Sequence, residues 1–354
     1  MRSSARRTTT VLGTAVAAFA LLLTACGSDE PEAPKATAAV QSSATAAAAA
    51  TQAAPAGVTV TDLMGRKVTV AKTPTKIVTT SPSALEMLYA AGGTAIARSS
   101  TAAAPGIDTS KMTDIGSAYQ PNFEAILKLQ PDLVIADASA QAPLAGQFEA
   151  QLKGVPVVFV GAVKYADVST SIRMLGLVTG TVEKAKASAD ALDATAKQVG
   201  DAVKGKTPTK TLVVVAGRDG QLSAALNDSF IGDMIKIAGA QNVAADLKQS
   251  GQVPGYATIS LETAFKDNPD VLLVIVPGNT PGPSISSIVS RSFPGLNAVK
   301  NKRVHEISLD VFLQSPGPRA AGGLKELAAF IQPEVKIAAS GGAASGGAAV
   351  VPGY

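Results

Sequence analysis

The chain of 354 residues contains no tryptophan, one cysteine and one histidine. Cys26 has no partner for a disulfide within the chain, and His305 alone cannot complete a zinc site built from cysteine and histidine. Aromatic residues make up 4% of the chain whereas 46% is hydrophobic, so a core must be built from Ala, Val, Leu and Ile. Strands of these residues are apolar on both faces, which favours parallel α/β layers.

The chain also has little excess of charge of either sign. The formal net charge is +4, but the first 25 residues contribute three arginines and no acid. Without them, 28 basic residues stand against 27 acidic ones, which leaves a net charge of +1. The sequence has no basic run with interleaved aromatic residues, so it predicts no nucleic-acid surface.

The common signatures of enzymes are missing as well. The chain has no G-x-S-x-G nucleophile elbow, no H-E-x-x-H metalloprotease motif and no second histidine to accompany His305. We also expect no phosphate-binding P-loop. Hydrolase and NTPase functions are therefore not predicted, and we expect a protein that is not an enzyme and needs no cofactor.

The first 25 residues have the pattern of an export signal. Three arginines precede an apolar segment at residues 11–23, which is too short to cross a bilayer as a stable helix. The segment ends in Leu-Thr-Ala-Cys-Gly at residues 23–27, which resembles the bacterial lipobox, where the cysteine becomes the lipid-modified first residue. Acyl chains on Cys26 would hold the exported protein at the outer face of the cytoplasmic membrane. The alternative is a plain secretory signal in which Cys26 has no role.

Two further segments lack large apolar side chains. Residues 26–56 are mostly Ala, Ser, Thr, Pro and Gln, which cannot bury enough surface to offset the entropy lost on ordering. We predict a disordered tether there, with an alanine-rich helix through residues 46–50 as the alternative. Residues 338–354 are rich in Ala and Gly without periodicity, which predicts a disordered tail.

The chain contains one motif twice. In residues 121–136, Asn122 has the character of a helix N-cap, a short apolar helix follows, and Pro-Asp leads into an apolar strand. The same order begins again at Ser260 with a constant offset of 138 residues. A glutamate follows each N-cap by two residues, Glu124 in the first copy and Glu262 in the second. The duplication predicts two lobes of like construction.

The most regular helical pattern lies between the two copies. Small and apolar residues recur at steps of four and three through residues 182–203, which predicts an amphipathic helix roughly 33 Å long. We interpret it as a connector between the lobes, with an ordinary surface helix of one domain as the alternative. The predicted organisation is an N-terminal α/β lobe at 57–166, a helical connector at 167–206 and a C-terminal α/β lobe at 207–337.

Several short segments together resemble a known family. They are the hairpin at 62–66, the strand and helix at 81–88, the segments 120–124 and 131–135, and the segments 238–243 and 315–319. In this order, behind a lipobox, they resemble the iron-siderophore, haem and vitamin B12 branch of the solute-binding proteins of ABC importers. The resemblance covers about residues 57–333.

The resemblance implies a class III periplasmic-binding-protein fold, with two Rossmann-like α/β lobes and parallel-rich sheets joined by one long helix. It implies a ligand in the cleft between the lobes, and a monomer that works with an ABC permease and its ATPase. It also implies that Glu124 and Glu262 dock onto arginines of the permease. Alternatively, each is an acid in a first helical turn, where the helix dipole favours it by about 0.3–1 kcal/mol.

In folds of this kind, ligands meet the loops that follow the carboxyl ends of the strands. The candidate ligand-binding residues in and near these loops are Tyr119, Arg218, Ser81, Tyr165, Tyr256, Arg98, Phe312 and Asn279. Tyr119 is the strongest candidate, because related proteins often place an aromatic residue of this loop against their ligand; the alternative is packing at the lobe edge. Arg218 is a candidate partner for a negatively charged chelate, unless it is a solvated turn residue. Arg319 is a further candidate for contacting the ligand, unless it caps or pairs within its own lobe.

The expected ligand is a ferric siderophore, then haem, then a corrinoid. Haem takes a tyrosine, histidine or methionine as axial ligand, and Tyr119 or Tyr256 would suit that role better than His305. Free zinc or manganese is disfavoured because such sites need several histidines and carboxylates together. The lack of tryptophan counts against cobalamin. A function of a different class is the alternative, namely that of a surface lipoprotein without a transport role.

Overall fold

The computed structural model describes five stretches of the chain. They are residues 57–101, 104–216, 221–250, 253–277 and 285–337. All of them belong to the unit that runs from Ala53 to Tyr354. The predicted export signal, Cys26, the tether and the C-terminal tail lie outside the described residues.

The first lobe is built on a five-stranded sheet in which every pairing is parallel. In spatial order its strands are β5 (Thr113–Asp114), β4 (Ala97–Arg98), β3 (Ile77–Thr79), β8 (Leu133–Asp137) and β9 (Val157–Val160). Its helices are α1 (Pro82–Ala90), α2 (Phe123–Lys128), α3 (Ala138–Gln141), the 3₁₀ helix η1 (Ala142–Leu144) and α4 (Ala145–Gln151). A small hairpin of β6 (Gly116–Ser117) and β7 (Gln120–Pro121) lies between β5 and α2 in the chain. Because the strands are parallel, the segments that follow them all leave from one edge of the sheet.

The second lobe has a mixed sheet in which β13 (Tyr256–Ile259), β11 (Leu222–Ala225), β10 (Thr209–Ala216), β14 (Val271–Val276) and β15 (Val304–Ser308) follow one another. β12 (Ala240–Asn242) pairs with the start of β10. Its helices are α7 (Phe230–Ile237), α8 (Leu261–Phe265), α9 (Ile285–Ser292), α10 (Asn297–Lys300), the π-helix η2 (Asp310–Gln314) and α11 (Ala320–Ile331). β11 is antiparallel to both β10 and β13, so β13 runs in the direction of β10. Therefore α8 starts at the edge where the parallel strands end, as α2 does in the first lobe.

The duplicated motif is confirmed in the backbone of both lobes. Asn122 caps α2 by accepting a hydrogen bond from the amide of Ala125 at 2.9 Å. Ser260 caps α8 in the same way, and the strands β8 and β14 follow the two helices. Even the left-handed residue before each strand is repeated, at Gln130 with φ 50° and Asn268 with φ 44°.

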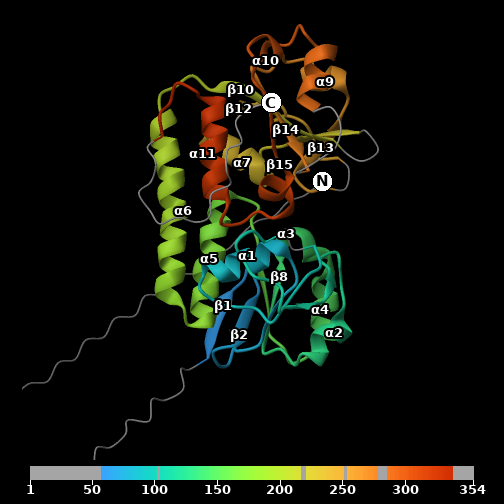
Figure 1. Ribbon diagram of the computed structural model, residues 1–354, viewed down its shortest axis with the longest axis vertical. Coiled ribbons are helices and arrows are strands. Elements are labelled where there is room, and N and C mark those ends of the chain that lie inside the picture. The colour runs from blue at the N-terminus through green and yellow to red at the C-terminus, as the bar shows by residue number, and fades with distance from the viewer. Residues whose placement is uncertain (1–56, 102–103, 217–220, 251–252, 278–284, 338–354) are drawn as a thin grey trace, which may run out of the picture. The chain divides into compact units, whose positions relative to one another are not determined.

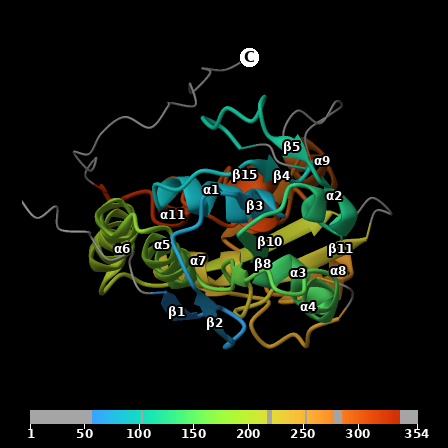
Figure 2. The same ribbon diagram turned by 90° about the horizontal axis from the view of Figure 1, so that it is seen from below.

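One long helix joins the lobes, and a second helix packs along it. The predicted connector is confirmed as α6 (Val182–Val203), and it is preceded by α5 (Tyr165–Thr179), which packs along it. Gly176 lies at the crossing, where an added Cβ would come within 2.2 Å of the Ala185 side chain. Both helices contact α1 of the first lobe and α7 of the second, and α6 also packs against α11. Figure 1 shows α6 running beside both lobes, and Figure 2 shows α5 and α6 together at one side of the sheets.

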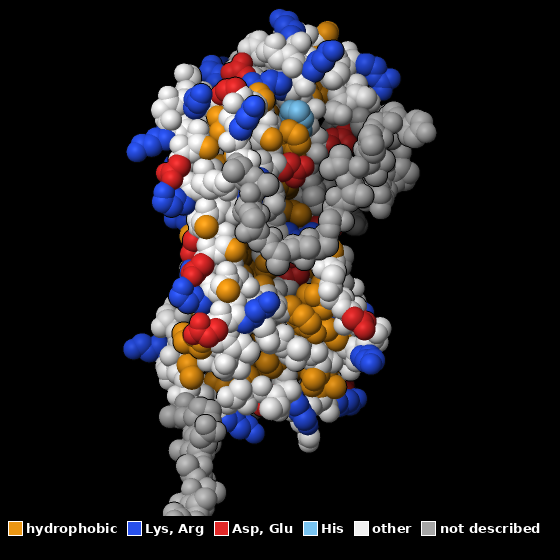
Figure 3. Space-filling view, turned by 60° about the vertical axis from the view of Figure 1, so that its left-hand side comes forward, with side chains coloured by type: hydrophobic (Ala, Val, Ile, Leu, Met, Phe, Trp, Pro, Cys, Tyr) orange, Lys and Arg blue, Asp and Glu red, His pale blue; other side chains and the backbone are white. Residues whose placement is uncertain are grey.

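The exposed side of these helices is polar and mixed in charge. Arg173 of α5 binds the carboxylates of Asp190 and Asp193 on α6 at 2.6 and 2.7 Å. Figure 3 shows this side of the molecule, with acidic side chains among the basic ones.

One apolar core lies beneath the helices and is shared by both lobes. Alternate residues of β8, such as Leu133 and Ile135, enter it from the first sheet. Val271 and Leu273 of β14, the duplicated strand, enter it from the second sheet. The intervening residues of the two strands face separate cores, one in each lobe. The two sheets are therefore joined by continuous apolar packing.

An ion pair also crosses between the lobes. Glu86 of α1, only 6% exposed, accepts hydrogen bonds from Nε and Nη2 of Arg319 at 2.9 and 2.8 Å. The hydroxyl of Ser315 donates to the same carboxylate at 3.2 Å. The alternative in which Arg319 caps or pairs within its own lobe is therefore wrong, because its partner Glu86 belongs to the other lobe.

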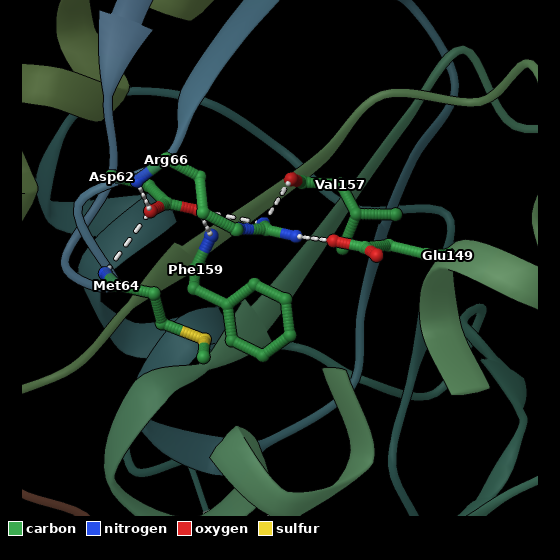
Figure 4. Close-up of polar contacts among 6 residues, drawn as sticks. All are labelled: Asp62, Met64, Arg66, Glu149, Val157 and Phe159. Carbon is green, nitrogen blue, oxygen red and sulfur yellow. Dashed lines mark hydrogen bonds and ion pairs between the residues drawn. The ribbon is translucent and has the colours of Figure 1, made fainter. Parts of the chain in front are cut away.

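The first lobe begins with a hairpin of β1 (Val58–Thr61) and β2 (Lys67–Val70), which is clamped to β9. Asp62 is 3% exposed and accepts hydrogen bonds from the amides of Met64, Arg66 and Phe159 and from the Arg66 guanidinium (Figure 4). The guanidinium lies 4.5 Å from the centre of the Phe159 ring, and it also binds the Val157 carbonyl and the Glu149 carboxylate. The hairpin thereby covers the β9 edge of the sheet.

We predict that Asp62→Ala lowers the free energy of unfolding by about 3–5 kcal/mol, because it leaves the Arg66 guanidinium and several amides without their buried acceptor. Glu149→Ala is the matched control. It removes the other carboxylate on Arg66, but Glu149 is 62% exposed, so the loss is below about 1 kcal/mol. Urea unfolding of the purified protein measures both values. Equal effects of the two substitutions would contradict the clamp.

Candidate functional site

A buried polar network lies where β3 and β8 end. Ser81 caps α1 by accepting from the amide of Ala84 at 3.0 Å, and its hydroxyl donates to Asp137 at 3.2 Å. Asp137 in turn caps α3 through the amides of Ser139 and Ala140. Burial raises the pKa of Asp137, although these amide hydrogen bonds act in the opposite direction. The network fixes the starts of two helices at the carboxyl edge of the first sheet.

Tyr119 is presented to solvent at the same edge. It forms the two-residue turn between β6 and β7 together with Ala118. The Tyr119 side chain is 65% exposed, whereas Ala118 is 6% exposed. An aromatic ring held outward on a short turn is a suitable contact for a flat or aromatic ligand. Of the tyrosines proposed from the sequence, Tyr119 has the ring available for such a contact.

Arg98 lies at the end of β4 on this edge. Its Nη1 donates to the Ser99 carbonyl at 2.9 Å and to Asp114 at 3.4 Å. The guanidinium is thus partly used in joining β4 to its neighbour β5.

Four other sequence-derived candidates are engaged inside the fold. Tyr165 is 2% exposed, and its hydroxyl donates to the Leu192 carbonyl of α6 at 3.1 Å. Tyr256 is 3% exposed and Phe312 is 1% exposed, and both belong to the shared core. Burial raises the pKa of Tyr256, which disfavours the phenolate that iron would need. With Ser81 used as a helix cap, none of the four presents a free surface for a ligand here.

Two candidates, Arg218 and Asn279, lie outside the described residues. The paired acids Glu124 and Glu262 both lie in the first turn of their helices, and both are exposed. Glu124 forms an ion pair with Lys128 at 2.8 Å, one helical turn later. Their matched positions follow from the duplicated motif, because α2 and α8 start at corresponding edges of their sheets.

His305 is held within its own lobe. Its ring stacks on Phe330 with the ring centres 4.0 Å apart and the planes 11° from parallel. Among the described residues, no group of three or more His, Cys, Asp and Glu side chains is arranged to hold a metal ion.

The P-loop spacing G-x-x-x-x-G-K-T does occur once, at residues 200–207, contrary to our expectation. In a P-loop this string joins a strand to the start of a helix, whose amides bind phosphate. Here Gly200 lies in the last turn of α6, and the string leads into β10. Since the carbonyl end of a helix disfavours anions, the match indicates no nucleotide site.

Two hollows in the described surface lie apart from Tyr119. One of about 560 Å³ is lined by Lys210, Lys236, Gln241 and neighbours where β10 and β12 begin. The other, of about 360 Å³, lies between the β1–β2 hairpin and the end of α5. Within the described stretches, no helix has the length and apolar character needed to cross a membrane.

Two residues that shape this region were not predicted from the sequence. Gln141 follows β8 by four residues and binds four groups of the network, and Glu86 joins the two lobes. A single polar residue after a strand carries no periodic signal. For Glu86 a signal was present, since it is the one acid in a helix whose other buried residues are small or apolar.

Comparison with known proteins gives a consistent result. The family model described as periplasmic binding protein matches residues 77–310. A Bacillus subtilis protein named as an uncharacterized ABC transporter substrate-binding lipoprotein is 30% identical over 284 residues, which cover 78% of this chain and 86% of that protein. A cobalamin-binding protein of Halobacterium salinarum is 24% identical over 276 residues, covering 77% and 73% of the two chains.

Solved structures share the fold. The crystal structure of an ABC transporter substrate-binding protein from Listeria monocytogenes has a TM-score of 0.62 at 24% identity. The alignment covers 74% of this chain and 100% of that chain. Further relatives are named for haem uptake and for binding petrobactin.

We predict that His305 titrates below its ordinary pKa of about 6.5, because burial and the charge of Arg303 disfavour the imidazolium. Protonation then opposes folding, so the free energy of unfolding decreases as the pH falls below about 6.5. As the chain has one histidine, a proton NMR titration follows a single imidazole signal. The urea-unfolded protein is the control. A native midpoint at or above the unfolded one would contradict the stacked, half-buried position.

Proposed function

The chain belongs to the periplasmic binding protein family and is a substrate-binding protein of ABC transporters, and we propose that it captures an iron chelate between its two lobes for delivery to a permease. The observation that carries the proposal is the exposed Tyr119 ring on the edge where the strands of the first sheet end. Ligands in open α/β folds bind outside the carboxyl ends of the strands.

The chemistry of Tyr119 favours an iron chelate as cargo. Its ring can stack on a porphyrin or on an aromatic siderophore, and its hydroxyl is a possible iron ligand. We place a ferric siderophore first and haem second. Cobalamin is the alternative, and the Halobacterium relative supports it. The proposal includes Arg218 and Asn279 as residues that contact the ligand.

The proposal extends to the position of the protein in the cell. Lipid on Cys26 holds the exported protein at the outer face of the membrane, and residues 26–56 give it reach. The lobes at 57–166 and 207–337, joined through 167–206, then present Glu124 and Glu262 to the permease. The name of the Bacillus relative, a lipoprotein, supports the anchor.

The visible absorption spectrum of the protein purified from its own host tests the proposal. A ferric siderophore, haem and a corrinoid each absorb in the visible range with distinct spectra, and apoprotein absorbs in none of their bands. The bands of a ferric chelate or haem are expected. Corrinoid bands would support the alternative ligand, and a colourless protein that takes up none of the three would refute the iron-chelate function.

We predict that Tyr119→Ala weakens binding of the bound chelate by about 2 kcal/mol, or roughly 30-fold, while leaving the free energy of unfolding unchanged. The side chain is exposed, so its removal costs little packing. Titration with haem, ferric enterobactin and cobalamin measures the affinity. Tyr119→Phe is the matched variant, because it keeps the ring and removes the hydroxyl: full affinity indicates stacking, and a loss equal to that of Tyr119→Ala indicates iron ligation. Unchanged affinity in Tyr119→Ala would show that the ring does not contact the ligand.

We further predict that Glu124→Ala combined with Glu262→Ala abolishes uptake and leaves chelate affinity intact, because both acids are exposed in matching helical turns. The control removes the same charge from two other exposed acids, Asp108→Ala with Asp267→Ala, and keeps uptake. Uptake of radioactive iron chelate by cells measures the effect. Normal uptake by the glutamate variant would remove the docking role.

A further inference from the structure

Gln141 is completely buried at the end of α3 and uses both ends of its amide. Its Oε1 accepts from the Thr80 hydroxyl at 2.6 Å and from the Asp137 amide at 2.9 Å. Its Nε2 donates to the carbonyls of Thr80 at 3.2 Å and Ala118 at 2.6 Å. One side chain therefore joins the end of β3, the end of β8 and the β6–β7 turn.

The partners fix which end of the amide points where. The backbone amide of Asp137 can only donate, so it must face Oε1. The carbonyls of Thr80 and Ala118 can only accept, so they must face Nε2. A carboxylate or an apolar side chain of similar size cannot satisfy all these groups.

The contact to Ala118 determines how the neighbouring residue is presented. In the two-residue turn, Ala118 points inward with its carbonyl bound to Gln141, and Tyr119 points outward. The base of the turn is held separately, by the Gly116 carbonyl bound to the Ser100 amide and the Ile115 carbonyl bound to the Asn122 amide. Gln141 thus holds the tip of the turn.

We propose that Gln141 is a positioning residue for ligand binding, which holds the β6–β7 turn so that Tyr119 is ordered before a chelate arrives. This inference rests on the proposed function, in which Tyr119 contacts the ligand. Its physical basis is pre-organisation, because a contact that is already ordered loses less entropy on binding. Gln141 does not touch the ligand and acts through Tyr119.

The first test needs no ligand. The chain has no tryptophan, so Tyr119→Trp introduces a single tryptophan at the turn, which can be excited at wavelengths where the remaining tyrosines do not absorb. Adding Gln141→Met should lower the anisotropy of this tryptophan, because the Ala118 carbonyl loses its partner. Thr80→Val is the matched control: it removes a hydroxyl from the same buried network but leaves the Gln141 contact with Ala118. If Gln141→Met does not yield folded protein, Gln141→Asn keeps the amide on a shorter side chain that does not reach Ala118.

The second test uses haem, ferric enterobactin and cobalamin with the native Tyr119. The chelate that binds the unmutated protein should bind the Gln141→Met protein about tenfold more weakly. Thr80→Val should change the affinity for this chelate less than about twofold. In the Tyr119→Ala background, Gln141→Met should add almost no further loss, because the contact through which it acts is gone.

The results separate the two ideas. If none of the three compounds binds the unmutated protein, the proposed function fails, while the anisotropy comparison still decides whether Gln141 orders the turn. Equal anisotropy in the Gln141→Met and Thr80→Val proteins would overturn the positioning role. Additive losses of affinity for Gln141→Met and Tyr119→Ala would overturn it as well, since they would show that Gln141 does not act through Tyr119.

Discussion

The apolar core shared by the two sheets is the constraint on which the rest of the structure depends. Alternate residues of the duplicated strands β8 and β14 enter it, and α5, α6 and α11 cover it. The ion pair between Glu86 and Arg319 adds a polar link, and removing either partner would leave a charge at a largely buried position. Wide separation of the lobes would expose this core to water, so the packing favours small movements between the lobes.

This constraint determines which parts of the surface are free for function. Strand interiors and connecting helices are committed to packing, and the turns at the carboxyl edges are not. Tyr119 lies on such a turn, while Tyr165 and Tyr256, with the same chemical capacity, are buried. The duplicated motif has a second consequence, because it gives both lobes an exposed glutamate in an equivalent first helical turn. An exposed edge on the first sheet and a pair of exposed acids thus accompany one repeated strand and helix arrangement.

The sequence predicted those parts of the fold that depend on local patterns. Periodicity identified α6 residue for residue, and the N-caps Asn122 and Ser260 were recognised from residue type and context. Long-range contacts were not predictable in this way. Whether Tyr165 faces a ligand or the Leu192 carbonyl depends on how α5 packs against α6, and the partner of Arg319 lies 233 residues away. The position of Gln141 likewise depends on three segments meeting, which no single stretch of sequence records.

Equilibrium titration of the purified protein with haem, ferric enterobactin and cobalamin tests the central claim most directly. The account predicts saturable binding of an iron chelate, one molecule per chain, whose affinity depends on the lobes remaining joined and on the exposed edge of the first sheet. Absence of saturable binding of all three compounds to folded protein would contradict it.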